Sequence, residues 1–315
     1  MVSFSIRDLS PAPNGWINYV KGVAAQLVGA GYSLSGFDCV FGGNIPIGAG
    51  LSSSAALENG VCYGLSEIFD LKLDRLSMLK YSQKAEHEFA GVECGIMDQF
   101  ASMMGKSDHA IRLDCRTLFY DYFPLKLDQF QFILCDSRVK HALVETEYNV
   151  RRMECEVGVK VIKKSFDQVI SLRDVTFEML EKLRNELPTK VFARCQYVLE
   201  ENKRVLQACT FLESGNLVEF GELMYGSHLG LSRLYEVSCK ELDFLVEFTV
   251  GRPEVLGARM MGGGFGGCTI NLVHKDQMDD FMAAIIPAYH EQFGHEAKIY
   301  VVGIVDGTSR ESNFA

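Results

Sequence analysis

The chain has 315 residues, of which 48% are hydrophobic, so it can bury a full core and form two lobes, and it is not a small peptide-like module. The formal net charge is -10, from 31 basic and 41 acidic residues with no long basic run, which argues against a nucleic-acid or anionic-membrane surface. The 10 cysteines include no C-x-x-C pair, and the sequence has neither a signal-peptide core nor an apolar stretch of bilayer-spanning length. We therefore expect a cytoplasmic protein with reduced thiols and no membrane or nucleic-acid partner.

The first third of the sequence alternates helical and extended patterns. Apolar residues recur at helical spacing after Pro11 and Pro13 and before two glycines, which predicts a helix. A Gly/Pro-rich loop then precedes an apolar segment with few charges, which is typical of a buried helix. The expected elements are a helix over 16–28, a strand over 33–41, a loop over 42–50, a helix over 52–69 and a helix over 75–89.

The remaining sequence predicts strands on both sides of a long helical region. Alternating β-branched and aromatic residues predict strands over 109–113, 118–123 and 132–136. Residues 144–245 are helical in pattern almost throughout, and mixed structure follows at 258–261, 268–273, 278–289 and 298–302. The sequence thus predicts an α+β chain of two lobes, with the division near Lys140: an N-terminal lobe over 1–140 and a C-terminal lobe over 141–315.

The strongest local motif runs from Pro46 to Ala56 and reads P-I-G-A-G-L-S-S-S-A-A. It places glycines and serines between a predicted strand and the start of a helix, where free N–H groups and the helix dipole favour phosphate. The lysine of G-x-x-x-x-G-K-[ST] is missing, which excludes a P-loop NTPase. A serine N-cap after a flexible turn would explain one serine and one glycine, but not two glycines and three serines so close together.

A second group of candidate residues consists of Glu86 and Asp98. A kinase that phosphorylates a hydroxyl needs one carboxylate to orient it and take its proton, and another acidic group to hold Mg²⁺ on the phosphates. The spacing of these residues does not by itself favour that function, because Glu86 also suits a solvated helix face and Asp98 a cap or turn.

A third motif, residues 259–270, matches G-x-G-x-x-G through Gly262, Gly264 and Gly267. A dinucleotide fingerprint should open a helix early in a βαβ unit, whereas this motif is late and precedes a predicted strand, so we reject a Rossmann interpretation. A tight β-hairpin turn remains the alternative.

In this order, the three motifs resemble those of the kinase superfamily that includes galactokinase, homoserine kinase, mevalonate kinase and phosphomevalonate kinase (the GHMP kinases). Two further segments are similar to galactokinases in particular: C-G-I-M-D-Q-F over 94–100 and E-Y-N-V-R-R over 147–152. W-I-N-Y-V-K-G over 16–22 also fits that family. The resemblance covers the chain from about Trp16 to its C-terminus, and it implies a two-lobed GHMP-kinase fold with the active site in the cleft between the lobes.

The resemblance also implies a role for individual residues. Asp98 would be the catalytic carboxylate facing the C1 hydroxyl of galactose, and Gly95 and Tyr148 would contact the sugar together with it. ATP and Mg²⁺ would be the cofactors, with Ser54 and Glu86 holding the metal. The expected ATP-binding residues are Gly48, Ala49, Gly50, Leu51, Ser52, Ser53, Ser54 and, near the adenine, Trp16; the expected C-terminal glycine motif is Gly262, Gly263, Gly264, Gly266 and Gly267. We expect a monomer acting on small-molecule substrates.

One family signature, G-R-x-N-x-I-G-E-H-x-D-Y, does not occur in the sequence. We therefore expect an N-terminally truncated galactokinase whose N-terminal sheet is incomplete. Three functions follow from this: an ATP-dependent galactokinase, a catalytically impaired nucleotide- or sugar-binding sensor, or a sister kinase acting on another sugar. Met261 departs from the threonine that is usual in the family.

Overall fold

The computed structural model describes residues 2–13, 15–46, 50–139 and 144–311. Its contacts divide the chain into two compact units, which we call unit 1 (Met1–Tyr122 with Ile304–Ala315) and unit 2 (Phe123–Gly303). This division differs from the predicted boundary at 140, which stays a prediction about the family's two lobes. No helix in the described part of the chain has the length and apolarity needed to cross a bilayer.

Unit 1 is a group of helices with a small sheet. Its helices form where apolar residues recur at helical spacing. Asp74 is the N-cap of the helix that begins at Arg75, and its side chain accepts a hydrogen bond from the Ser77 N–H at 2.9 Å. The elements are α1 (Ile17–Gly29), α2 (Ser53–Ile68), α3 (Arg75–Ala85), a π-helical turn (Glu86–Ala90), α4 (Met97–Met104), β1 (His109–Leu113) and β2 (Tyr120–Pro124), which pairs with β1.

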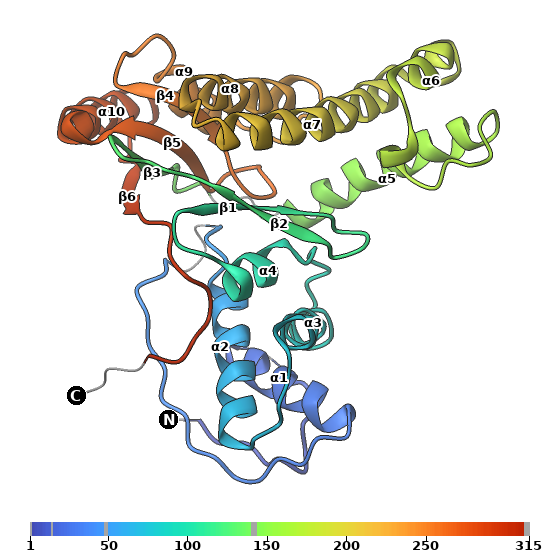
Figure 1. Ribbon diagram of the computed structural model, residues 1–315, viewed down its shortest axis with the longest axis vertical. Helices are drawn as coiled ribbons and strands as arrows, with labels where there is room; N and C mark the ends of the chain where they lie inside the picture. Colours follow the sequence, from blue (N-terminus) through green and yellow to red (C-terminus); the bar gives the residue numbers. More distant parts are fainter. Residues whose placement is uncertain (1, 14, 47–49, 140–143, 312–315) are drawn as a thin grey trace. The chain divides into compact units, whose positions relative to one another are not determined.

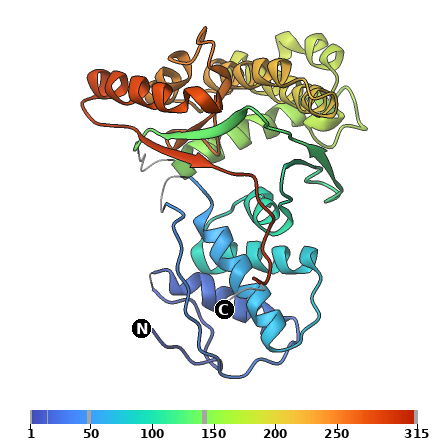
Figure 2. The ribbon, with the colours of Figure 1, turned by 60° about the vertical axis from the view of Figure 1, so that its left-hand side comes forward.

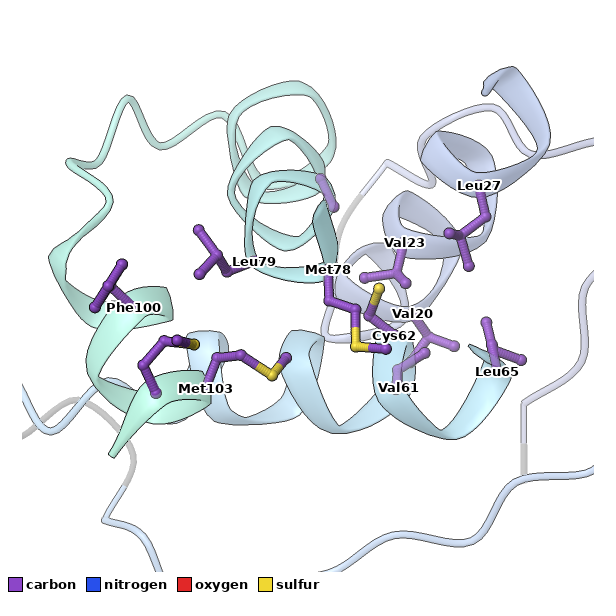
Figure 3. Close-up of a cluster of buried hydrophobic side chains, with 12 residues drawn as sticks. Val20, Val23, Leu27, Val61, Cys62, Leu65, Met78, Leu79, Phe100 and Met103 are labelled. Carbon is purple, nitrogen blue, oxygen red and sulfur yellow. The ribbon is translucent and has the colours of Figure 1, made fainter. Parts of the chain in front are cut away.

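The core of unit 1 lies between its helices (Figure 3). Val23 and Leu27 of α1, Leu79 of α3 and Met103 of α4 are all fully buried there. Apolar burial of this kind contributes about 1.5–3 kcal/mol for each large side chain. This core packs against α2 and α4, and so fixes the helices whose first turns carry Ser54 and Asp98.

Unit 2 is built on a sheet that, among the described residues, has four antiparallel strands in the order β4-β5-β3-β6. Ile133 of β3 lies opposite Asn271 of β5 on one side and Val301 of β6 on the other. The elements are β3 (Phe130–Asp136), α5 (Val144–Lys163), α6 (Phe177–Lys182), α7 (Thr189–Glu213), α8 (Leu217–Arg233), α9 (Lys240–Glu247), β4 (Val255–Met260), β5 (Cys268–His274), α10 (Met278–Phe293) and β6 (Lys298–Val302), with single 3-10 turns at Leu172–Asp174, Arg184–Glu186 and Lys275–Gln277.

Helices α8, α9 and α10 cover one face of this sheet (Figures 1 and 2). Phe281 and Ile285 of α10 are fully buried against Ile133 of β3 and Val273 of β5. Helix α7 packs beside α8 and against α5, where a second core forms away from the sheet. The predicted α+β class is confirmed.

The expected elements agree with the structure with one clear exception. The predicted strand over 33–41 is wrong: the segment has no strand pairing, and the Val40 side chain is 100% exposed. Alternation and β-branched residues make a segment suitable for a strand, but a strand also needs a neighbour to accept its backbone hydrogen bonds. The predicted helix over 75–89 also changes character, because α3 ends at Ala85 and continues as the π-helical turn.

Candidate active site

The predicted phosphate-binding loop leads directly into α2. Gly50 and Ser52 both have left-handed backbones, with φ of 72° and 55°, and turn the chain into the first helical residue, Ser53. The Ser52 side chain makes no capping bond, and the first turn of α2 contains no acidic residue. Backbone N–H groups and the positive end of the helix dipole are therefore left for an anion. Gly48 and Ala49 lie outside the described residues.

The Glu86 carboxylate is joined to this loop through Ser54. The Ser54 hydroxyl donates to Glu86 Oε1 at 2.7 Å, while Glu86 Oε2 accepts from Gln99 Nε2 and from the Cys94 thiol. Glu86 is the first residue of the π-helical turn that follows α3, and π-helical turns are often found at functional sites. The structure thus brings together the two residues predicted to hold a metal.

Ser54 and Glu86 offer the kind of donors that Mg²⁺ prefers. Mg²⁺ on ATP usually takes one or two protein oxygen ligands and completes its shell with phosphates and water. A carboxylate and a hydroxyl 2.7 Å apart fit that pattern. In the described part of the chain, no group of three or more His, Cys, Asp or Glu side chains could form an all-protein metal site.

Asp98 lies in the first turn of α4 and is close to the same loop. Partial burial raises the pKa of the Asp98 carboxyl, a hydrogen bond with the Ser52 side chain acts in the opposite direction, and the charge of Glu86 raises the pKa further. A raised pKa makes a carboxylate a better general base near neutral pH. Gly95, the predicted sugar contact, is exposed and lies three residues before Asp98, ahead of α4.

Glu58 is a residue of this region that the sequence analysis missed. It follows Ser54 by one turn on α2, its side chain is 0% exposed, and neither carboxylate oxygen has a hydrogen-bond partner in the described structure. Its i, i+4 spacing from Ser54 on one helix face was the signal that could have identified it.

Trp16, expected near the adenine, precedes α1. Its side chain is 47% exposed. The centroids of the Trp16 and Phe41 rings lie 5.1 Å apart in an edge-to-face arrangement. An exposed indole face can stack on a flat base, so the adenine contact stays a prediction.

The C-terminal glycine motif forms the turn between β4 and β5. Two glycines are required there: a Cβ on Gly264 would lie 2.1 Å from the Val237 carbonyl oxygen, and one on Gly266 would lie 2.4 Å from that of Val139. The turn joins antiparallel strands and opens no helix, so the rejection of a Rossmann fingerprint is correct. The ring of Tyr148, on α5, lies beside Gly263, at 3.8 Å from where its Cβ would be.

These features define a class of enzyme, the GHMP small-molecule kinases. The model of the GHMP kinases N terminal domain matches residues 18–106, and that of the GHMP kinases C terminal domain matches residues 208–291. A solved mevalonate kinase, 16% identical with a TM-score of 0.59, shares the fold alone.

Within that class the chain belongs to the galactokinase family. It is 44% identical over 297 residues to a galactokinase of Thermotoga maritima, which covers 94% of this chain and 82% of the relative. A galactokinase of Clostridium tetani is 41% identical over 98% of this chain and 79% of its own length. The galactokinase of Lactococcus lactis, solved in complex with galactose, superposes with a TM-score of 0.89 at 36% identity, over 97% of this chain and 79% of that one. The resemblance inferred from the motifs is confirmed.

Proposed function

We propose that the chain transfers the terminal phosphate of ATP, as its Mg²⁺ complex, to the C1 hydroxyl of galactose. The observation that carries this proposal is the convergence of three features in unit 1: the glycine/serine loop at the start of α2, the Ser54–Glu86 pair and the Asp98 carboxylate beside Ser52. Phosphoryl transfer depends mainly on positioning and charge stabilisation, which this arrangement can supply.

The proposed reaction gives these residues distinct roles. Asp98 accepts the proton of the sugar hydroxyl as the oxygen attacks the terminal phosphorus, and ADP leaves. N–H groups at the start of α2 and the hydroxyls of Ser52 and Ser53 hold phosphate oxygens. Ser54 and Glu86 hold Mg²⁺, which neutralises phosphate charge when bound. Tyr148, in unit 2, contacts the sugar.

Galactose-dependent ADP release tests the proposal. We expect Asp98→Asn to lower kcat about a thousandfold, because general-base catalysis usually contributes a factor of 10² to 10⁴. Asp108→Asn is the matched control, since Asp108 is exposed in the same unit and its left-handed backbone, with φ of 56°, suits asparagine as well. Equal activity of the two variants would exclude Asp98 as the base.

Metal dependence is tested separately. Chelation of Mg²⁺ should abolish turnover, and Glu86→Gln should raise the Mg²⁺ concentration needed for half-maximal rate.

Nucleotide binding without turnover of any sugar would favour the impaired sensor, and turnover of a different sugar would favour a sister kinase. Sedimentation tests the further proposal that the chain is a monomer, and fractionation of cells tests its cytoplasmic location.

A further inference from the structure

Arg151 is a nearly buried arginine of α5 to which the proposed reaction gives no role. Its side chain is 11% exposed and makes three charge-assisted hydrogen bonds. Nε donates to the Tyr235 carbonyl oxygen at 3.0 Å, Nη2 to the Glu236 carbonyl oxygen at 2.8 Å, and Nη1 to the Glu147 carboxylate at 3.0 Å. A planar guanidinium can satisfy these three directions at once, whereas an ammonium group cannot.

The same guanidinium contacts the glycine-rich turn. Its Cζ lies 5.6 Å from the ring centroid of Phe265, a distance at which a cation is attracted to an aromatic face. Phe265 has a left-handed backbone, with φ of 58°, and its N–H donates to the Val237 carbonyl oxygen at 2.7 Å. Arg151 therefore holds both partners of that bond, the segment 235–237 and the turn itself.

Helix α5 contacts the turn at a second residue, about one helical turn before Arg151. Tyr148 precedes Arg151 by three residues and so lies on the same face of the helix, and its ring lies beside Gly263. Tyr148 remains 44% exposed, which leaves its ring available to a ligand. The position of this ring relative to the turn consequently depends on how Arg151 holds the two together.

A second arginine also holds the segment around Glu236. Arg194 of α7 is 1% exposed, donates to the Glu236 carboxylate at 2.6 Å and to Glu154 at 2.8 Å, and also bonds the Leu234 carbonyl oxygen. Among the described residues, these hydrogen bonds of Arg194 do not reach the glycine-rich turn. Its role is to support the fold, whereas Arg151 alone of the two reaches the turn.

We propose that Arg151 is a positioning residue for sugar binding: it fixes the glycine-rich turn against which the Tyr148 ring lies. The inference rests on the proposed function in one respect, the contact of Tyr148 with galactose. It assigns Arg151 no contact with a reacting atom.

Arg151→Lys tests the proposal, with Arg152→Lys as the matched control. Arg152 is the next residue, but it is 62% exposed and pairs with Glu156 at 3.2 Å. We expect Arg151→Lys to raise the KM for galactose about tenfold and the KM for ATP less than twofold. With no substrate present, backbone hydrogen exchange in peptides covering 261–267 should be faster in Arg151→Lys than in the unmodified chain. The control should change none of these values.

Removing the aromatic partner provides a second variant that keeps the charge. Phe265→Leu should reproduce the higher KM for galactose. In the double variant with Arg151→Lys, the KM for galactose should rise by less than the product of the two single fold increases. Unchanged exchange in Arg151→Lys, or an increase in the KM for ATP equal to that for galactose, would overturn the proposal. If the unmodified chain does not phosphorylate galactose, the proposed function fails, and the exchange measurement alone decides whether Arg151 fixes the turn.

Discussion

Glu58 carries an ionisable group in an environment that does not suit its charge. Burial raises the pKa of its carboxyl to about 9, the charge of Glu86 acts in the same direction, and the Gln99 side chain offsets part of the shift. The Gln99 contact does not satisfy hydrogen-bond geometry, since both Glu58 oxygens lack a partner. Glu58 is therefore protonated at neutral pH, beside a carboxylate that is predicted to hold a metal.

The raised pKa of Glu58 predicts a stability that depends on pH. Because the folded pKa lies above the ordinary value of 4.5, the contribution to stability is complete below pH 4.5 and is lost as the pH rises toward 9. Glu58→Gln, which is neutral at all pH values, should be more stable than the unmodified chain by about 5 kcal/mol at pH 8 and nearly equal to it at pH 4.5. Urea unfolding with chelator present measures this. Glu67→Gln, at an exposed position of the same helix, should show no such gain, and equal gains in both variants would contradict the assignment.

The Ser52 hydroxyl should tune the carboxylate of Asp98. Its hydrogen bond lowers the pKa of Asp98 against the effects of burial and of Glu86. Ser52→Gly removes the bond and keeps a residue that accepts the left-handed backbone. The acid limb of kcat/KM against pH should then move to higher pH, because the base stays protonated over a wider range. A limb that drops in height without moving would show that Ser52 acts on phosphate alone.

Close packing of α1 against α3 depends on a glycine. A Cβ on Gly22 would lie 2.9 Å from Ala85 Cβ and 3.0 Å from Phe89 Cγ, so Gly22→Ala should destabilise unit 1 by about 1–3 kcal/mol through overpacking. Gly64→Ala in α2 is the control, because nothing lies within 4 Å of its Cβ position. It should stabilise by about 0.5–1 kcal/mol through helix propensity. Chemical denaturation measures both changes, and a loss of stability in both would point to the helices themselves.

The sequence predicts those elements whose signals are local. Residues 298–302 form β6 as expected, and the glycine/serine loop could be found because a turn before a helix is encoded within a few residues. The segment 33–41 could not be assigned correctly, since its pairing depends on a neighbour that a periodic pattern does not specify. The role of Arg151 was missed for the same reason: the two carbonyl groups that it holds lie 84 and 85 residues away.

At the scale of the whole molecule, the chain passes between the two units twice. After β6 it returns to unit 1, where the Gly307 N–H donates to the Gly105 carbonyl oxygen at 2.9 Å and the Thr308 N–H to that of Ser102 at 2.8 Å. The Asp306 carboxylate also accepts the Ser107 N–H at 2.8 Å. The predicted division into consecutive lobes could not include this return, because it joins residues about 200 positions apart. Its consequence is that residues 306–308 support the end of α4, the helix that carries Asp98.

Gly307→Val should detach this segment from α4. A Cβ on Gly307 would lie 2.5 Å from the Met103 carbonyl oxygen, a backbone atom that cannot move aside cheaply, so we expect a loss of about 2 kcal/mol in unit 1. Hydrogen exchange should become faster in α4 and stay unchanged in β5, because β5 lies in the core of unit 2. Ser309→Val adds the same branched side chain at an exposed position and should leave both regions protected. Faster exchange in β5 as well would mean that the two units unfold together, and protection of α4 in both variants would mean that the returning segment contributes nothing to its support.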